Sequence, residues 1–95
     1  MTYRLLFHEL ALKEWYKLDP TIREQFKKKL TKILANPHIA SLKLNNMKDC
    51  YKVKLRSIGY RLVYKIVEDK LIVQVIAVGV RNKNYVYEKA FLRLN

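Results

Sequence analysis

The residues best suited to chemistry form an alternating pattern in the second half of the chain. Between residues 51 and 56, large apolar side chains alternate with basic ones, which predicts a β-strand with one buried and one cationic face. A turn at 57–60 returns the chain as a second strand, pairs Lys54 with Val63 and adds basic side chains to the same face. Five cations then share this face: Lys52, Lys54, Arg56, Arg61 and Lys65. Because like charges facing each other across strands destabilise a sheet, this face either binds an anion or spreads its side chains into water.

A cationic face of this kind suits the cleavage of a phosphodiester. Arginine offers a planar fork of donors to phosphate oxygens on which negative charge develops. A base must also take the proton of the nucleophile, but His8 and His38 are far apart in the sequence, and we expect both at the surface. Crowding by other cations favours the neutral form of a lysine and lowers its pKa. Lys54, between Lys52 and Arg61, is therefore the candidate base.

The 7 tyrosines of the chain are the second group of residues that could take part in binding RNA. Tyr87 lies in the first turn of a predicted last helix, shortly after Arg81, where an aromatic ring can stack on an unpaired base. The alternative is that Tyr87 packs this helix onto the sheet, and periodicity alone does not decide between the two. A further set is expected in the core or at its edge: Trp15, Cys50, Tyr51, Tyr60 and Tyr64.

Charge and composition narrow the class of protein. The chain of 95 residues carries 20 Lys and Arg against 8 Asp and Glu, a formal net charge of +12, which favours a polyanionic partner. With 51% hydrophobic residues and only 2 Gly and 2 Pro, it is expected to fold. A single cysteine excludes an internal disulfide, and the sequence predicts no metal and no cofactor. We find no apolar run long enough for a membrane span and no signal peptide pattern, so we expect a cytoplasmic protein.

The elements that must position these residues follow from the hydrophobic periodicity. Apolar residues that recur about every 3.6 residues predict two helices. The second begins at Pro20 with Asp19 as its N-cap. Beyond a loop at 37–49 the period becomes two, and the run at 71–78 is apolar enough for a central strand. The predicted fold class is α+β in one domain, residues 1–95, with these parts: an N-terminal strand (2–7), an antiparallel two-helix hairpin (8–18 and 20–35), a three-stranded antiparallel meander completing a four-stranded antiparallel sheet, and a short C-terminal helix (85–94).

Several segments, in their order and spacing, resemble the RelE toxins of bacterial toxin–antitoxin pairs. They are residues 49–56 (DCYKVKLR), 59–64 (GYRLVY), 78–81 (VGVR) and 86–87 (VY), together with 11–15 (ALKEW) and 23–30 (REQFKKKL) in the predicted helices. The likeness covers essentially the whole chain. Because K-x-K-L-R and Y-R-L-V-Y recur across the wider RelE/ParE superfamily, the resemblance rests on the segments taken together.

The resemblance implies a specific reaction. RelE toxins enter the ribosomal A site and cleave mRNA there: the ribose 2′-OH attacks the adjacent phosphate, leaving a 2′,3′-cyclic phosphate and a 5′-OH. By matching residue, Lys52 and Lys54 would stand near the scissile phosphate, with Lys54 as general base. Arg61 would stabilise the charge of the transition state, and Arg81 would stabilise or protonate the leaving 5′-oxygen. Tyr87 would stack on the nucleotide and orient it.

The resemblance also implies partners. Basic residues outside the catalytic set would bind the ribosome and its RNA: Arg23, Lys27, Lys28, Lys32, Lys43 and Arg56. A cognate RelB-like antitoxin would neutralise the toxin by covering the cationic face or displacing the last helix, and operator DNA would be bound only through the antitoxin complex. Asn45, Asn46 and Lys48 stand where the family's loop commonly has a basic residue, a glycine and a proline, so docking through this loop is expected to differ.

Two other functions stay open at this point. A ParE-like member of the superfamily would inhibit gyrase and cleave no RNA, although the joint presence of Lys52, Lys54, Arg81 and Tyr87 favours the ribonuclease. A catalytically inert RNA-binding module would use the same basic sheet face to hold phosphates. The first prediction is therefore a ribosome-dependent endoribonuclease, and the other two are its alternatives.

Overall fold

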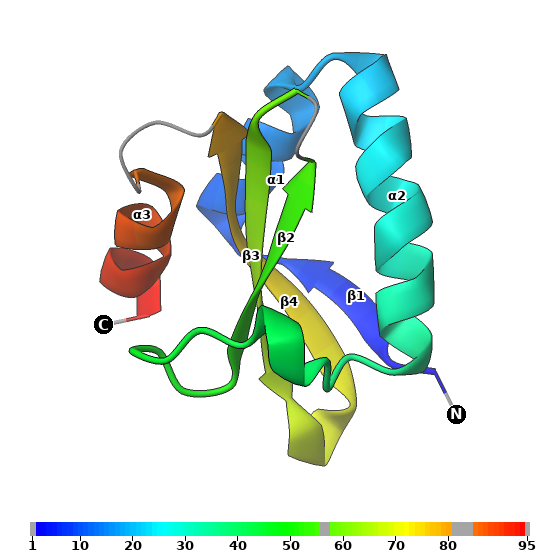
Figure 1. Ribbon diagram of the computed structural model, residues 1–95, viewed down its shortest axis with the longest axis vertical. Helices are drawn as coiled ribbons and strands as arrows, with labels where there is room; N and C mark the ends of the chain where they lie inside the picture. The colour runs from blue at the N-terminus through cyan, green and yellow to red at the C-terminus, as the bar shows by residue number, and fades with distance from the viewer. Residues whose placement is uncertain (1, 56–57, 81–84, 95) are drawn as a thin grey trace.

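A mixed β-sheet with helices on both faces forms the centre of the computed structural model, which describes residues 2–55, 58–80 and 85–94 (Figure 1). Within these residues the elements are β1 (Arg4–Phe7), α1 (Glu9–Lys17), α2 (Pro20–Ala35), a 3-10 turn (Ala40–Leu42), β2 (Cys50–Leu55), β3 (Tyr60–Val67), a second 3-10 turn (Glu68–Lys70), β4 (Ile72–Val80) and α3 (Tyr85–Leu94). This order confirms the predicted α+β class. Among the described helices, none is long and apolar enough to cross a membrane.

The strand order corrects one expectation about the sheet. Across the described residues the order is β1-β4-β3-β2, and β2, β3 and β4 form the predicted antiparallel meander. β1, however, pairs with β4 in parallel, with Arg4 opposite Ile72 and Phe7 opposite Val75, so the sheet is mixed rather than antiparallel. A parallel pair needs a long crossover connection, and the segment with α1 and α2 supplies one by returning the chain to the end of the sheet where β1 began.

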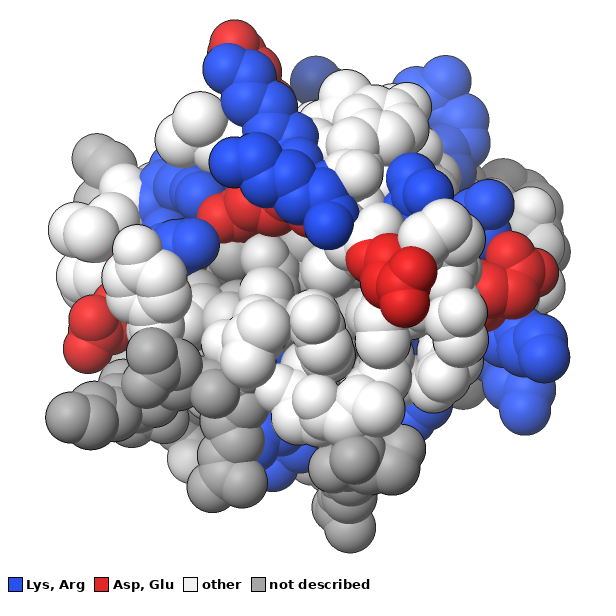
Figure 2. All heavy atoms as spheres, turned by 90° about the horizontal axis from the view of Figure 1, so that it is seen from above, with Lys and Arg blue, Asp and Glu red and all other residues white. Residues whose placement is uncertain are grey.

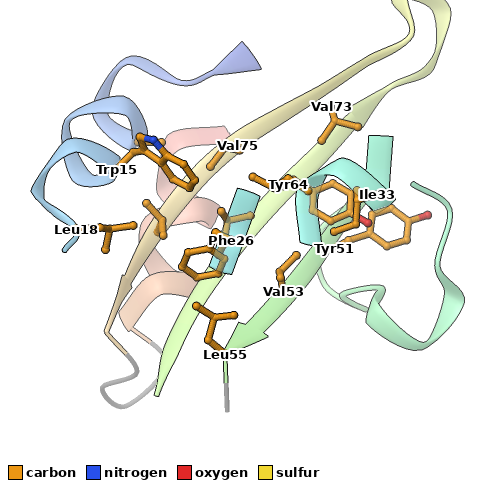
Figure 3. Packing of buried hydrophobic residues seen from close by; sticks show 14 of the residues in the cluster. Trp15, Leu18, Phe26, Ile33, Tyr51, Val53, Leu55, Tyr64, Val73 and Val75 are labelled. Atoms are coloured by element: carbon orange, nitrogen blue, oxygen red, sulfur yellow. The ribbon is translucent and has the colours of Figure 1, made fainter. Parts of the chain in front are cut away.

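The larger core fills the space between the sheet and the first two helices (Figure 3). Phe26 of α2 is fully buried there, and Trp15 of α1 packs beside it with ring centroids 6.2 Å apart. Tyr51 and Tyr64 are opposite each other in the β2–β3 register, and their rings stack at 5.2 Å. Tyr60 packs at the edge of this cluster, so the predicted core placement of these aromatic residues is confirmed.

A smaller core lies under α3, on the opposite face of the sheet from α2 (Figure 1). Cys50 belongs to it, and burial raises the pKa of its thiol to about 11. The β3–β4 register shifts between Val63 and Tyr64, which leaves Ile76 as an extra residue on β4. Because of this bulge, Ile76 and Ala77 both join the α3 core, while β4 is buried on both faces as predicted for a central strand.

The first two helices begin at different kinds of N-cap. α2 begins at Pro20, and Asp19 takes the N-cap position as predicted, although its side chain forms no capping hydrogen bond. At α1, the Nδ1 atom of His8 accepts a hydrogen bond from the backbone N–H of Leu10 at 3.1 Å. His8 is therefore engaged in a helix cap and not in the cationic face.

An ion cluster occupies the outer edge of β4 beyond the short strand β1. In the described residues β1 pairs with β4 only as far as Val75. Past that point Glu14 of α1 accepts a hydrogen bond from the backbone N–H of Val78 at 3.3 Å, and Arg93 of α3 donates to the carbonyl of Ile76 at 2.8 Å. The Arg93 guanidinium also binds Glu14 through two hydrogen bonds of 2.8 and 2.9 Å. Side chains of Glu14 and Arg93 thus form the hydrogen bonds to the backbone of β4 that a longer β1 would otherwise form.

Acid should weaken this cluster in a measurable way. Burial alone would raise the pKa of the Glu14 carboxyl, but hydrogen bonds from Arg93, Lys89 and the Val78 amide lower it from 4.5 to about 2. A carboxyl with a lowered folded-state pKa stabilises the fold above its unfolded pKa and loses that contribution as the pH falls through its folded pKa. Between about pH 5 and pH 2 the free energy of unfolding should therefore fall by about 3 kcal/mol from this group.

The matched variant for this measurement is Glu14→Gln, which removes the titrating group and keeps an acceptor. Chemical denaturation of both proteins from neutral pH down to about pH 2 should show free energies of unfolding that differ at neutral pH and converge as the pH falls through this range. A difference that stays constant down to about pH 2 would show that the carboxylate contributes no pH-dependent stability.

Candidate functional site

One row of residues across three strands forms the centre of the basic face. Lys54 of β2 lies opposite Arg61 of β3, and Arg61 lies opposite Gly79 of β4. The predicted pairing of Lys54 with Val63 is wrong, because the connection spans residues 56–59 and not 57–60. The register therefore moves by two residues, and since side chains alternate with a period of two, every side chain keeps its predicted face.

Three of the five predicted cations come together around this row. Lys52, Lys54 and Arg61 are half-buried on the face opposite the larger core, and Lys54 and Arg61 are directly paired. Lys65 lies four residues further along β3, about 13 Å from Arg61. It lines a separate hollow of about 220 Å³ near the C-terminal end of α3. Arg56 lies outside the described residues.

Helix α3 brings Tyr87 to the neighbourhood of this row. A Cβ atom on Gly79 would lie 3.5 Å from Cγ2 of Val86, so the first turn of α3 packs beside the paired Arg61. Tyr87, the next residue, is half-buried and packs against the smaller core. It also lines a hollow of about 680 Å³ between α3 and residues 44–46. The ring therefore packs the helix, as one sequence interpretation has it, and borders an open space as the other requires. Arg81 lies outside the described residues.

Lys29 is a basic residue of this surface that the sequence analysis did not predict. β2 is one of the two edge strands of the described sheet, and the Lys29 ammonium reaches across from α2 to donate a hydrogen bond of 2.9 Å to the backbone carbonyl of Lys54. Its position could have been predicted from helical spacing, because Lys29 follows the buried Phe26 by three residues and precedes the buried Ile33 by four. This places it on the flank of α2 that faces the strand edge.

A basic hollow continues the face around the edge of the sheet. Its volume is about 590 Å³, and it lies between α2, the turn at 39–42 and β2. Four lysines line it: Lys29, Lys32, Lys52 and Lys54. The structure thus joins one predicted RNA-binding residue, Lys32, to the two predicted catalytic lysines on a single concave surface.

The other predicted RNA-binding residues are spread over neighbouring surfaces. Lys27 and Lys28 are exposed on α2, and Arg23 is half-buried one turn earlier. Lys43 is exposed, and its ammonium lies 6.0 Å from the centroid of the Tyr51 ring. Figure 2 shows Lys and Arg side chains on several sides of one face, one group of them extending from the upper edge toward the middle beside acidic side chains. The positive charge is therefore distributed over several sides of the molecule.

The remaining histidine belongs to a different part of the surface. Nε2 of His38 lies 2.9 Å from the Glu68 carboxylate, which also accepts a hydrogen bond from the Tyr3 hydroxyl. These hydrogen bonds, from Tyr3 first and His38 second, lower the pKa of the Glu68 carboxyl. The predicted surface position of His38 is confirmed. Among the described residues, no group of three or more His, Cys, Asp or Glu is arranged to hold a metal ion.

Fold and charge define a class first: a small α+β protein with a strongly basic sheet face bordered by a C-terminal helix. A family model described as the ParE toxin of the type II toxin–antitoxin system parDE matches residues 5–85. The chain belongs to this toxin family.

Relatives and solved structures agree with this assignment. The chain is 54% identical over 94 residues to the mRNA interferase toxin RelE of Escherichia coli (strain K12) and to the mRNA interferase RelE of Shigella flexneri, with 99% of each chain covered. The structure of a mutant of the E. coli toxin RelE in the free state matches with a TM-score of 0.92 at 53% identity, covering 100% of both chains. The intact E. coli RelBE toxin–antitoxin complex contains a chain that matches with a TM-score of 0.82 at 56% identity, covering 85% of this chain and 99% of that one. The predicted resemblance to RelE toxins is confirmed.

Proposed function

We propose that this chain is an endoribonuclease toxin that cleaves mRNA in the ribosomal A site and so stops translation. The observation that carries the proposal is the direct pairing of Lys54 with Arg61, with Lys52 beside them on the same face. A relative that is 54% identical over 94 residues is named mRNA interferase toxin RelE, which supports RNA cleavage as the activity. We treat residues 1–95 as one toxin domain.

The proposed reaction divides the work among these side chains. Lys54 in its neutral form takes the proton of the ribose 2′-OH, whose oxygen then bonds to the adjacent phosphorus. Arg61, directly opposite, donates its planar fork to the phosphate oxygens on which charge develops, and Lys52 adds a second positive charge. The bond from phosphorus to the 5′-oxygen breaks, giving a 2′,3′-cyclic phosphate and a 5′-OH. Arg81 stabilises the leaving oxygen, which takes up a proton from water while Lys54 returns its proton to solvent, and Tyr87 stacks on the nucleotide.

The proposed partners follow from charge and from the relatives. The ribosome and its RNA bind the basic surfaces, through residues that include the following: Arg23, Lys27, Lys28, Lys32, Lys43 and Arg56. The structure of a RelE mutant bound to a RelB antitoxin peptide matches with a TM-score of 0.83 at 54% identity, which supports a RelB-like antitoxin as the neutralising partner. Operator DNA is contacted through the toxin–antitoxin complex, and the site of action is the cytoplasm, where ribosomes translate.

The direct experiment is to map mRNA 5′ ends on translating ribosomes after adding the purified protein. We expect discrete cuts within A-site codons, no cuts in the same mRNA without ribosomes, and no cuts with the Arg81→Ala variant. Intact mRNA on ribosomes would contradict the proposal. Cutting of free mRNA at the same positions and rates would remove its ribosome dependence while leaving the ribonuclease activity.

A second candidate is inhibition of gyrase, because the matching family model is described as the ParE toxin. The same preparation should be added to a gyrase supercoiling assay. We expect unchanged supercoiling together with mRNA cleavage. Inhibited supercoiling with intact mRNA would assign the chain to the gyrase-directed function, and RNA binding without either effect would leave an inert RNA-binding module.

A further inference from the structure

Four apolar residues of α3 pack against the smaller core: the buried Val86 and Ala90, and the partly buried Tyr87 and Leu94. Within this helix, Val86 and Ala90 are the buried residues, and both are small. Its larger apolar side chains Tyr85, Phe91 and Leu92 are exposed, the last at 73%. A helix whose fully buried side chains are both small is expected to detach more readily than the core elements around it. Whatever else attaches α3 therefore has a large influence on where Tyr87 lies.

The additional attachment comes from Glu14, on the opposite face of the sheet. α1 packs on the larger core and α3 on the smaller one, so a contact between them must pass around the edge of β4. Glu14 makes this contact, binding the Arg93 guanidinium through both carboxylate oxygens and the Lys89 ammonium at 2.8 Å. The side chains of Glu14 and Arg93 are only 17% and 11% exposed. A carboxylate in this setting is a strong and directional anchor.

The anchor fixes α3 at two points that lie one turn apart. Lys89 and Arg93 are separated by four residues and share one side of the helix, so binding both restrains its rotation as well as its distance from the sheet. Arg93 is held further by the carbonyl of Ile76, and Glu14 by the amide of Val78. Both backbone groups belong to β4, the strand that carries Gly79 in the row with Lys54 and Arg61. The anchor and the basic face are thus tied to the same strand.

We propose that Glu14 is a positioning residue for the toxin's reaction: by clamping α3 to β4, it sets Tyr87 relative to the paired Lys54 and Arg61. The inference rests on the proposed ribonuclease function for its kinetic part. Glu14 touches neither substrate nor the reacting atoms in this scheme, and it acts through the placement of one helix.

Amide hydrogen exchange tests the clamp without reference to activity. Glu14→Gln keeps an acceptor for the Val78 amide and removes the charge that holds Lys89 and Arg93. Exchange of the α3 amides should become at least ~10-fold faster than in wild type, and α3 should still exchange faster than β3 and β4, which open only with the whole fold. Glu9→Gln is the matched control, because Glu9 is an exposed acid on the same helix. Unchanged exchange of α3 in Glu14→Gln would overturn the proposal.

A double-mutant cycle tests whether Glu14 acts through Tyr87. In single-turnover cleavage on saturating ribosomes, Glu14→Gln should be about 10-fold slower than wild type, and Glu9→Gln unchanged. If Glu14 only positions Tyr87, the double variant Glu14→Gln/Tyr87→Ala should be no slower than Tyr87→Ala alone. Effects that multiply would show that Glu14 supports the reaction by a route other than Tyr87, which overturns the positioning role.

The two readouts separate failure of this inference from failure of the proposed function. If wild-type protein cleaves no mRNA, the ribonuclease proposal fails, and the clamp is decided by the exchange of α3 alone. If wild type cleaves and Glu14→Gln cleaves equally fast despite faster α3 exchange, the ribonuclease proposal stands and the positioning role fails.

Discussion

Replacing Lys54 by alanine should slow single-turnover cleavage of mRNA on ribosomes by ~10²-fold or more, as expected for the loss of a general base. Lys54 lies directly opposite Arg61 in the β2–β3 register, beside the residue that we propose to bind the reacting phosphate. The measurement is the rate of appearance of the cut 5′ end at saturating ribosomes. A rate within a few-fold of wild type would rule out the base role.

Lys54→Arg is the variant that separates proton transfer from charge. Arginine keeps the positive charge and phosphate contact, but its guanidinium does not lose a proton at any working pH. If Lys54 is the base, Lys54→Arg should be nearly as slow as Lys54→Ala. If arginine restores most of the rate, Lys54 acts by electrostatic stabilisation, and the base must be found elsewhere.

Replacing Arg61 by alanine should slow the same step by ~10²- to 10³-fold, the usual effect of removing a donor to developing negative charge. Strand pairing on both sides, opposite Lys54 and Gly79, fixes the backbone of Arg61 and directs its side chain to the basic face. Binding of the protein to ribosomes should change much less than the rate, because several other basic residues contact the RNA in our proposal. An equal loss in binding and rate would assign Arg61 to docking instead.

Lys65→Ala is the matched control for Arg61→Ala. It removes one positive charge from the same strand and the same face, so the loss of net charge is identical. Lys65 lines a different hollow, beside Met47 and Phe91, and its removal should leave the cleavage rate within a few-fold of wild type. A loss similar to that of Arg61→Ala would mean that total charge, not position, governs the reaction.

The elements of the fold are predictable where local signals are strong. Pro20 and the Asn36–Pro37 pair predict the limits of α2, and the structure has the helix at Pro20–Ala35. The strand periodicity likewise predicts the faces of Lys52, Lys54 and Arg61. The parallel pairing of β1 with β4 is not predictable in this way, because no local pattern states which distant strand becomes a neighbour.

The missed parts of the site are contacts between distant residues. Glu14 and Arg93 are 79 residues apart in the sequence, and each looks like an ordinary surface charge on an amphipathic helix. Lys29 looks like one more lysine in a basic run, although its ammonium binds the edge of β2. The exact position of a turn is also hard to predict from sequence. Placing the β2–β3 connection one residue too late moves each predicted partner on β3 by two positions, as for Lys54. The period of two protects the prediction of faces from this error.

The place of β4 in the sheet has a consequence for how this protein is made. β4 is the last of the described strands to be synthesised, yet it lies between β1 and β3. A nascent chain that ends before β4 therefore has an unpaired β1, a two-stranded remainder and no row joining Lys54 and Arg61 to Gly79. Long-range pairing of this kind forms late in folding. We expect a ribosome to complete and release each molecule of this toxin before that molecule acquires the surface proposed to disable ribosomes.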